Sequence, residues 1–428
     1  MALPTTPRTL RTLRALRAAA RTGRARAAAA IAATAVGVPL LLAPAAAHAA
    51  AGPIWGTLDT QTATAATEAA AGVGMAMFEF NWAAYEPTQG KFTASYMTAM
   101  KAELKAYQAA GMKVTLGLGL QDPPAWALAL NNGTYIDQTG AAAAGAADLV
   151  FSASVRSAVA TYLGAINASM PLDQFWAIRL GDAAGLGEML YPGTGTYYAF
   201  TNSALTGAGL PAGMTKNPDP AWKPGTAGLT PAQITAWVTW YVGGLDNLTG
   251  WEMTTLGGLG FKGYYEALTP GSGTRPDQLT ADENSNLPND GTTGVGAVWQ
   301  LYYANLPSKT DVIAYISSVA DNSGGNDLCT AADDTQPLTS PALDAWSATR
   351  WITRIAAQYG LPVAGENPGL NLPASLDTFY TNTASTGMMA AALAQARSCG
   401  FVAFYWAHDV HLWDGTIPFA DYAAAIAG

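Results

Sequence analysis

From Ile54 to the C-terminus, short apolar runs alternate with longer segments in which apolar residues recur at helical spacing. This alternation is typical of repeated βα units built around a parallel sheet. The pattern predicts strands over residues 54–58, 75–80, 113–120, 175–180, 261–268, 312–319, 362–364 and 401–406. It predicts helices over residues 95–110, 154–166, 231–259, 295–306, 347–359 and 386–398.

Eight strands with intervening helices indicate one α/β domain, a single (β/α)8 TIM barrel over residues 50–428. Long segments leave several of the predicted strands, at residues 121–152, 181–229, 269–294 and 321–346. The stretch 269–290 is rich in Gly, Pro and Asn and could be a linker between domains. We interpret it as a rim loop because the βα alternation resumes after it. Active sites of such barrels lie on the face where loops leave the strands.

Residues 1–49 differ from the rest of the chain. Seven arginines precede an apolar run that starts at Ala27 and ends in Ala47-His48-Ala49, a small-x-small cleavage pattern. We interpret this segment as a signal peptide for export, which predicts a secreted, extracellular protein. A membrane anchor is the alternative, because the run is long enough to span a bilayer. Pro39, Pro44 and the cleavage pattern argue against a stable anchor.

The charge of the remaining chain is strongly acidic. Without residues 1–49, which contain no Asp or Glu, 14 basic residues face 30 acidic ones, a net charge near −16. Such a surface repels phosphate backbones, so we expect no nucleic-acid partner. Cys329 and Cys399 are the two cysteines, and an exported chain with an even count usually oxidises them. We expect one disulfide; two buried free thiols are the alternative.

Two glutamates follow predicted strands in positions suited to sugar chemistry. Glu188 lies beyond the fourth predicted strand and Glu366 just beyond the seventh. Cleavage of a glycosidic bond needs one carboxylic acid to protonate the leaving oxygen and one carboxylate opposite it, as nucleophile or as base for water. This pair is our catalytic candidate, and the chemistry requires no cofactor. Glu79 and Glu86 are weaker candidates, Glu86 because Pro87 follows it in a turn.

Several short motifs resemble a known group of enzymes. Residues 78–92 (FEFNWAAYEPTQGKF) and the Pro-Pro-Ala-Trp turn at 123–126 are similar to the second and third units of retaining (β/α)8 glycoside hydrolases, most closely the family 42 β-galactosidases. In that clan the acid/base glutamate follows strand four and the nucleophile ends strand seven. The resemblance therefore implies that Glu188 is the acid/base and Glu366 the nucleophile.

One motif departs from that clan. The clan usually has Asn before the acid/base glutamate, where this chain has Gly187. The segment 187–192 (GEMLYP) is instead similar to the strand-four motif of β-amylases, which invert configuration. Both stereochemical outcomes therefore remain open, as does the identity of the sugar.

Further candidates to contact the carbohydrate also follow predicted strands or lie in them. Aromatic rings offer flat apolar faces to sugar rings, and a charge within a barrel strand, such as Arg179, must be paired. For Arg179 we favour a structural ion pair slightly over substrate contact. The substrate-binding candidates are Asn81, Trp82, Trp126, Arg179, Tyr191, Tyr315, Asn367, Trp406, His408 and Trp413, with Asp182 and Asp321 as weaker ones.

Outside residues 1–49 the chain has two histidines, His408 and His411, both after the last predicted strand. A metal site could use them with Asp409 and Asp414, although such a ligand set would be unusually local and oxygen-rich. We prefer hydrogen bonding to sugar hydroxyls or to Glu366, and expect no metal.

The sequence as a whole predicts a secreted glycoside hydrolase of oligo- or polysaccharides that works by double displacement. An inverting, β-amylase-like hydrolase and a noncatalytic glycan-binding cell-wall protein are the alternatives. The oligomeric state is not encoded in any pattern we recognise.

Overall fold

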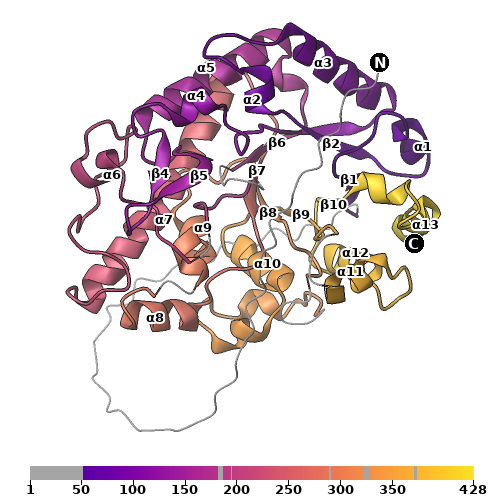
Figure 1. Ribbon diagram of the computed structural model, residues 1–428. Helices are drawn as coiled ribbons and strands as arrows, with labels where there is room; N and C mark the ends of the chain where they lie inside the picture. The colour runs from indigo at the N-terminus through magenta and orange to yellow at the C-terminus, as the bar shows by residue number, and fades with distance from the viewer. Residues whose placement is uncertain (1–51, 182–186, 194, 289–290, 322–326, 371–373) are drawn as a thin grey trace.

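The computed structural model describes residues 52–428 apart from residues 182–186, 194, 289–290, 322–326 and 371–373. Eight parallel strands in this part of the chain close into a barrel, in the order β1-β10-β9-β8-β7-β6-β3-β2 (Figure 1). They are β1 (Ile54–Thr57), β2 (Met75–Glu79), β3 (Lys113–Gly117), β6 (Ala177–Leu180), β7 (Tyr264–Thr269), β8 (Val312–Ile316), β9 (Val363–Glu366) and β10 (Ala403–Trp406). The predicted (β/α)8 barrel and each of its strands are confirmed. The predicted signal peptide lies outside the described residues.

The barrel strands are buried on both faces, and alternate residues belong to two separate cores. Met75, Met77, Ile313 and Tyr405 pack inside the barrel. The residues between them, such as Phe78, pack outward against the helices. This two-sided burial explains why the strands appear in the sequence as continuous apolar runs.

Helices surround the barrel, and the six predicted ones are present. They are α3 (Ala94–Ala109), α5 (Ala153–Ser169), α7 (Pro231–Gly258), α9 (Trp299–Asn305), α10 (Ala348–Gln358) and α12 (Met388–Ser398). Thr230 caps α7 in a reciprocal arrangement with Gln233, and Pro231 occupies the first turn. Helix α9 is shorter than predicted, because Gly296 adopts φ +79° and separates it from a 3₁₀ turn, Thr292–Val295.

Further elements were not predicted from the sequence. They are the helices α1 (Ala65–Ala70), α2 (Trp82–Tyr85), α4 (Ala125–Leu128), α6 (Asn202–Thr206), α8 (Pro276–Asn284), α11 (Ala374–Thr381) and α13 (Phe419–Ala427), and the hairpin β4 (Thr134–Ile136) and β5 (Ala142–Ala147). Most are short, and β5 consists of Ala and Gly, which carry no strand signature. Helix α13 lies beside β1 (Figure 1), where Tyr422 donates a hydrogen bond to the Gly56 carbonyl at 2.7 Å.

The loops that leave the strands carry much of this additional structure. The hairpin and α4 lie between β3 and α5, α6 lies between β6 and α7, and α8 lies between β7 and α9. The long connections are therefore on the carboxyl side of the strands, as predicted. None of the helices in the described part of the chain is long and apolar enough to cross a membrane.

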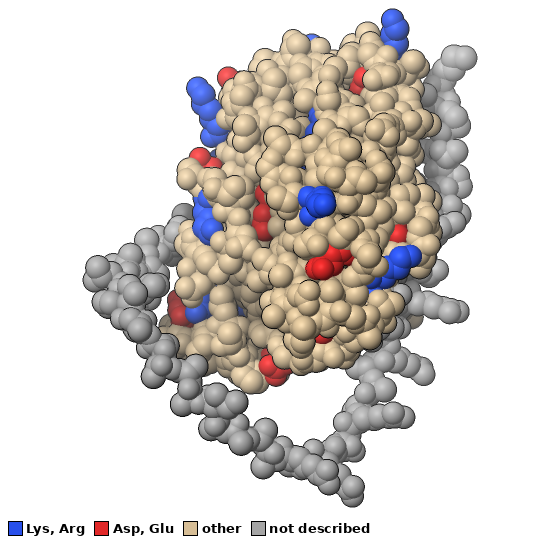
Figure 2. Space-filling model, turned by 90° about the vertical axis from the view of Figure 1, so that its left-hand side faces the viewer, with Lys and Arg blue, Asp and Glu red and all other residues tan. Residues whose placement is uncertain are grey.

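On the face shown in Figure 2 most of the surface is uncharged, and the basic side chains stand apart from one another. Elsewhere Arg350 on α10 is part of an ion-pair network: it donates to both carboxylate oxygens of Asp333 at 2.7 Å and to Asp327 at 3.0 Å.

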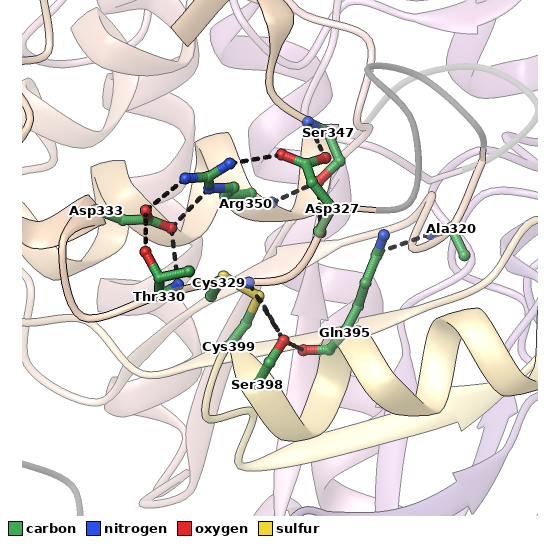
Figure 3. The surroundings of a disulfide bond; sticks show 10 residues. All are labelled: Ala320, Asp327, Cys329, Thr330, Asp333, Ser347, Arg350, Gln395, Ser398 and Cys399. Atoms are coloured by element: carbon green, nitrogen blue, oxygen red, sulfur yellow. Dashed lines mark hydrogen bonds and ion pairs between the residues drawn. A yellow bond between two sulfur atoms is a disulfide. The ribbon is translucent and has the colours of Figure 1, made fainter. Parts of the chain in front are cut away.

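The disulfide between Cys329 and Cys399 lies beside this ion-pair network (Figure 3). It joins the loop after β8 to the C-terminal end of α12, across 70 residues of sequence. The Cys329 amide also donates to Ser398 Oγ at 3.3 Å. The predicted disulfide is present, and it fastens the loop between β8 and α10 to the helix that precedes β10.

Replacing both Cys329 and Cys399 by alanine should lower the free energy of unfolding. For a loop of 70 residues, the chain-entropy model gives roughly 4 kcal/mol. Denaturant titration of the oxidised protein and of the double variant would measure the difference. Equal stabilities, or labelling of both thiols in the unreduced protein, would contradict this expectation.

Candidate active site

Glu188 and Glu366 lie at the same end of the barrel. Glu366 is the last residue of β9, and Glu188 follows β6 after a short loop. The two ends of that loop touch, since a Cβ placed on Gly181 would lie 1.9 Å from the Gly187 carbonyl oxygen. The Met189 amide then donates to the Leu268 carbonyl of β7 at 2.7 Å. Glu188 is therefore held next to the strand ends although seven residues lie between it and Leu180.

The carboxylate of Glu366 is held by two donors from neighbouring strands. Arg179 Nη2 of β6 donates to Glu366 Oε2 at 2.8 Å, and the Tyr315 hydroxyl of β8 donates to the same oxygen at 2.6 Å. The second oxygen, Oε1, accepts a hydrogen bond from none of the described residues. The side chain is 14% exposed, so one oxygen is fixed from below while the other is left for a ligand.

The carboxyl group of Glu188 has a different environment. Its side chain is nearly buried, and Ser317 Oγ donates to Oε1 at 2.5 Å. Burial raises the pKa of Glu188 to about 7, the negative charge of Glu366 adds to this effect, and the Ser317 hydrogen bond opposes it. At pH values below 7 this side chain is mostly a neutral acid that can donate a proton.

Strand β8 and its extension contact both glutamates. Tyr315 binds Glu366 and Ser317 binds Glu188. Ser317 continues the pairing with β7 through its amide, which donates to the Thr269 carbonyl at 3.1 Å. Residues two apart on a strand point to the same side and are separated by roughly 7 Å. The two carboxyl groups are thus held by Tyr315 within β8 and by Ser317 just beyond its end.

Glu266 of β7 lies beneath this pair and was not identified from the sequence. It is fully buried, faces Arg179 across the β6–β7 register, and accepts from Arg179 Nε at 3.4 Å. Burial raises the pKa of Glu266 to about 7 although the charge of Arg179 opposes the rise. The argument that a charge within a barrel strand must be paired, which singled out Arg179, applies equally to this residue.

A polar cavity of about 240 Å³ lies at the carboxyl ends of β1 and β2, on the same face of the barrel. Its lining includes Asp59, Glu79, Asn81 and Asp122. The Glu79 side chain is exposed and accepts from Gln121 Nε2 at 2.5 Å. Part of the side chain is in contact with water, but the surrounding protein removes much of the water from around the carboxyl group. This desolvation raises the pKa of Glu79 to about 7. Glu79, the weaker candidate of the sequence, is therefore part of the barrel mouth.

Three of the predicted aromatic contacts are fully buried. Trp82 packs against Trp126 and donates to Glu86 Oε2 at 2.9 Å. Tyr191 stacks on Tyr241 of α7 with ring centroids 4.0 Å apart. Trp406 belongs to the outer core, because strand alternation turns its neighbour Tyr405 into the barrel. The expectation that Trp82, Tyr191 and Trp406 offer a face to a sugar is not met, since their rings support the site from behind.

Trp126 and Trp413 retain accessible surface. Trp126 is half-buried near the mouth, and its indole NH donates to the Glu86 carbonyl at 2.9 Å. Trp413 stacks on Phe419 of α13, and its indole NH donates to Glu68 and Asp409, each at 3.1 Å. Trp413 is therefore engaged with the outer helix α13, whereas Trp126 packs edge-on against Trp82.

The polar candidates separate into supports and accessible groups. Asn367 is buried and clamps the chain after β10, since its amide accepts from the Ala407 NH at 3.0 Å and donates to the Ala407 carbonyl at 3.3 Å. Asn81 caps α2 and donates to Asp122 at 2.8 Å. Asn81 also lines the polar cavity. Asp182 lies outside the described residues, and Asp321 lies in the first part of the loop after β8.

His408 is paired with Asp59, whose carboxylate lies 2.8 Å from Nδ1. Burial lowers the pKa of His408, but the hydrogen bond and charge of Asp59 outweigh it and raise the pKa overall. The nearby His411 contacts the Tyr380 hydroxyl at 2.9 Å instead. Among the described residues, no group of three or more His, Cys, Asp or Glu side chains is arranged to hold a metal ion.

Known proteins resemble this chain in fold, but none of the protein families resembles it in sequence. No protein-family model and no curated protein matches the chain. The catalytic domain of β-amylase from Paenibacillus polymyxa superposes with a TM-score of 0.59 at 14% identity, over 88% of this chain and 99% of that one. These values show a shared barrel fold.

Two β-galactosidases have a similar fold. The enzyme from the Antarctic haloarchaeon Halorubrum lacusprofundi gives a TM-score of 0.52 and that from Marinomonas ef1 gives 0.50, each at 13% identity over 87% of this chain. The present chain covers 57% and 58% of their lengths, so they contain much additional structure. The solved structures that resemble this barrel thus include glycoside hydrolases of more than one kind.

Replacing Ser317 by alanine should move the ionisation of Glu188 to higher pH. The hydroxyl hydrogen-bonds the carboxylate and lowers its pKa, so its loss should shift the titration upward by about one pH unit. NMR of protein labelled with ¹³C at the glutamate carboxyl carbons would follow it, with the exposed Ser308→Ala as control. An unchanged or lower midpoint would show that Ser317 does not stabilise the ionised form.

Proposed function

We propose that this protein is a glycoside hydrolase in which Glu188 is the acid/base and Glu366 the nucleophile. The observation that carries the proposal is the pair of glutamates held by Tyr315 of β8 and by Ser317, which directly follows the last residue of that strand. One carboxyl group is buried and favours its proton, and the other binds a guanidinium. Glycoside hydrolysis requires this division into an acid and a carboxylate.

The double-displacement reaction follows from these contacts. Glu366 Oε1, to which no described residue donates, attacks the anomeric carbon while Oε2 stays bound to Arg179 and Tyr315. The bond from the anomeric carbon to the leaving oxygen breaks, and that oxygen takes the proton of Glu188. Glu188, now ionised, accepts a proton from water, and the hydroxide formed displaces Glu366.

The substrate is proposed to be a carbohydrate whose hydroxyl groups enter the polar cavity. Its wall offers the carboxylate of Glu79 and the side chain of Asn81 as hydrogen-bond partners. His408 is paired with Asp59 of the cavity lining, and the half-buried Trp126 lies in α4, after β3, on the same side of the barrel. The accessible members of the predicted contact set, Asn81, Trp126 and His408, are therefore the proposed sugar contacts, whereas Arg179 and Tyr315 act on Glu366.

An inverting hydrolase is the second candidate, and two observations favour it. The motif at 187–192 resembles that of β-amylases, and the Paenibacillus polymyxa β-amylase domain matches along 99% of its length. In this mechanism Glu366 would activate a water molecule for direct attack, while Glu188 would still protonate the leaving oxygen.

We further propose that the protein acts outside the cell. The arginine-rich, apolar segment at residues 1–49 supports export, and the disulfide between Cys329 and Cys399 is the kind of bond that persists in oxidising compartments.

The variants Glu188→Gln and Glu366→Gln should each lose turnover with little loss of stability, because the change is nearly isosteric. We expect about 10²–10⁴-fold lower kcat for Glu188→Gln and at least as large a loss for Glu366→Gln. Release of reducing sugar from polysaccharides and of nitrophenol from a panel of nitrophenyl glycosides would measure it. Glu283→Gln on the outer helix α8 is the matched control.

Wild-type turnover in either site variant would remove that residue from the mechanism. If the wild-type protein binds polysaccharides but releases no sugar from any member of the panel, the protein is a glycan-binding module and the hydrolase proposal is wrong.

The first product should retain the anomeric configuration of the substrate. Retaining enzymes hold their two carboxyl groups about 5 to 5.5 Å apart, whereas inverting enzymes need roughly 6.5 to 9.5 Å to admit a water molecule. Proton NMR recorded within the first minutes of hydrolysis, before mutarotation, would distinguish the two anomers. Appearance of the inverted anomer first would replace double displacement by the β-amylase-like mechanism.

A further inference from the structure

The guanidinium of Arg179 lies between two carboxylates inside the barrel. Nη2 donates to Glu366 Oε2 at 2.8 Å on the side of the mouth, and Nε donates to Glu266 Oε2 at 3.4 Å on the buried side. The ring centroids of Tyr315 and Tyr405 lie 4.5 and 5.4 Å from the guanidinium carbon. Arg179 is 8% exposed and Glu266 is fully buried, so water screens neither charge strongly.

Glu266 is itself fixed by the far side of the barrel. The Tyr405 hydroxyl of β10 donates to Glu266 Oε1 at 3.3 Å and contacts Thr115 Oγ1 of β3 at 2.6 Å. Arg179 and Glu266 are direct neighbours in the β6–β7 register. The guanidinium is therefore anchored by strands that do not carry the proposed catalytic pair.

We propose that Glu266 is a positioning residue that acts on Glu366 through Arg179. It orients the guanidinium toward Glu366. It also supplies the buried negative charge that Arg179 requires once Glu366 has become a neutral ester. The inference rests on the proposed function, because it assigns Glu266 a role in the covalent step of that reaction.

The charge balance of the reaction gives the reason. Before attack, Glu366 carries a negative charge next to Arg179. In the glycosyl-enzyme, Glu366 is a neutral ester, while the guanidinium cannot lose its proton. A buried charge without a partner is strongly unfavourable. Among the described groups that face Arg179, the phenols of Tyr315 and Tyr405 are neutral, because burial raises the pKa of each well above 10. Of the two carboxylates that accept hydrogen bonds from Arg179, Glu266 is the one that still carries a negative charge at this stage, since the newly ionised Glu188 is bound by Ser317 instead.

The protonation of Glu266 follows the charge of Glu366. Burial, the largest effect, raises the pKa of Glu266 to about 7, and the negative charge of Glu366 also raises it. The positive charge of Arg179 and the hydrogen bond from Tyr405 lower the pKa. Tyr315 adds a neutral phenol on the β8 side. When Glu366 loses its charge, the repulsion between Glu366 and Glu266 disappears, while the attraction between Arg179 and Glu266 remains. The ionised form of Glu266 is then favoured at the stage of the reaction that needs it.

A titration that requires no substrate tests this coupling. In protein labelled with ¹³C at the carboxyl carbons of its nine glutamates, the Glu266 resonance is identified as the one lost in Glu266→Gln. In Glu366→Gln, which mimics the neutral ester, Glu266 should titrate at least one pH unit lower than in the wild type. The control Glu252→Gln removes another fully buried glutamate, on α7, and should leave the titration unchanged. An equal midpoint for Glu266 in the wild type and in Glu366→Gln would overturn the proposal.

Kinetics provide the second readout. In Glu266→Gln, kcat should fall at least tenfold while KM changes less than threefold, since the counter-charge is needed only after binding. Glu266→Asp should recover part of the lost kcat, and Glu252→Gln should leave both constants unchanged. A loss of kcat in Glu266→Gln that Glu266→Asp does not recover, or a loss expressed mainly in KM, would refute the role. If the carboxyl titrations are coupled but no glycoside is hydrolysed, the pairing of Glu266 with Glu366 is retained and the proposed function fails.

Discussion

The ion pair between Arg179 and Glu366 is the interaction on which the mouth of this barrel depends. A buried guanidinium needs compensating groups around it, and strands β7 to β10 supply two carboxylates and two aromatic rings. Because the pair joins β6 to β9 across β7 and β8, it also fixes where the Glu366 carboxylate can point. The geometry of the proposed nucleophile is thus a consequence of charge burial in the barrel.

Glu188 is positioned by different means. The chain leaves β6 at Gly181 and returns at Gly187 with its backbone in contact, so the acid stays near the strand end. Met189 and Tyr191 then anchor the following segment to β7 and α7. The aromatic residue of the 187–192 motif therefore acts as a packing anchor for the glutamate that precedes it.

The two glutamates also differ in what surrounds them. Ser317 is the one described hydrogen-bond partner of Glu188, whereas Glu366 binds a cation and a phenol. Burial raises the pKa of Glu188 and so favours its neutral, proton-donating form. Tyr315 belongs to β8 and Ser317 directly follows it, so one segment of the chain contacts both glutamates.

The sequence by itself determined the barrel, the face that carries the long loops, and the two glutamates at strand ends. These features depend on local patterns: two-sided burial gives continuous apolar runs, and the strand period places polar residues at their ends. It also indicated that Arg179 must be paired.

Only the tertiary structure decided which partners Arg179 has, because Glu266 and Glu366 lie 87 and 187 residues away in the sequence. Side-chain direction was decided there as well: strand alternation turned Tyr405 inward and Trp406 outward, and packing buried Trp82 and Tyr191. Such outcomes depend on register and on distant neighbours, which a linear pattern does not encode.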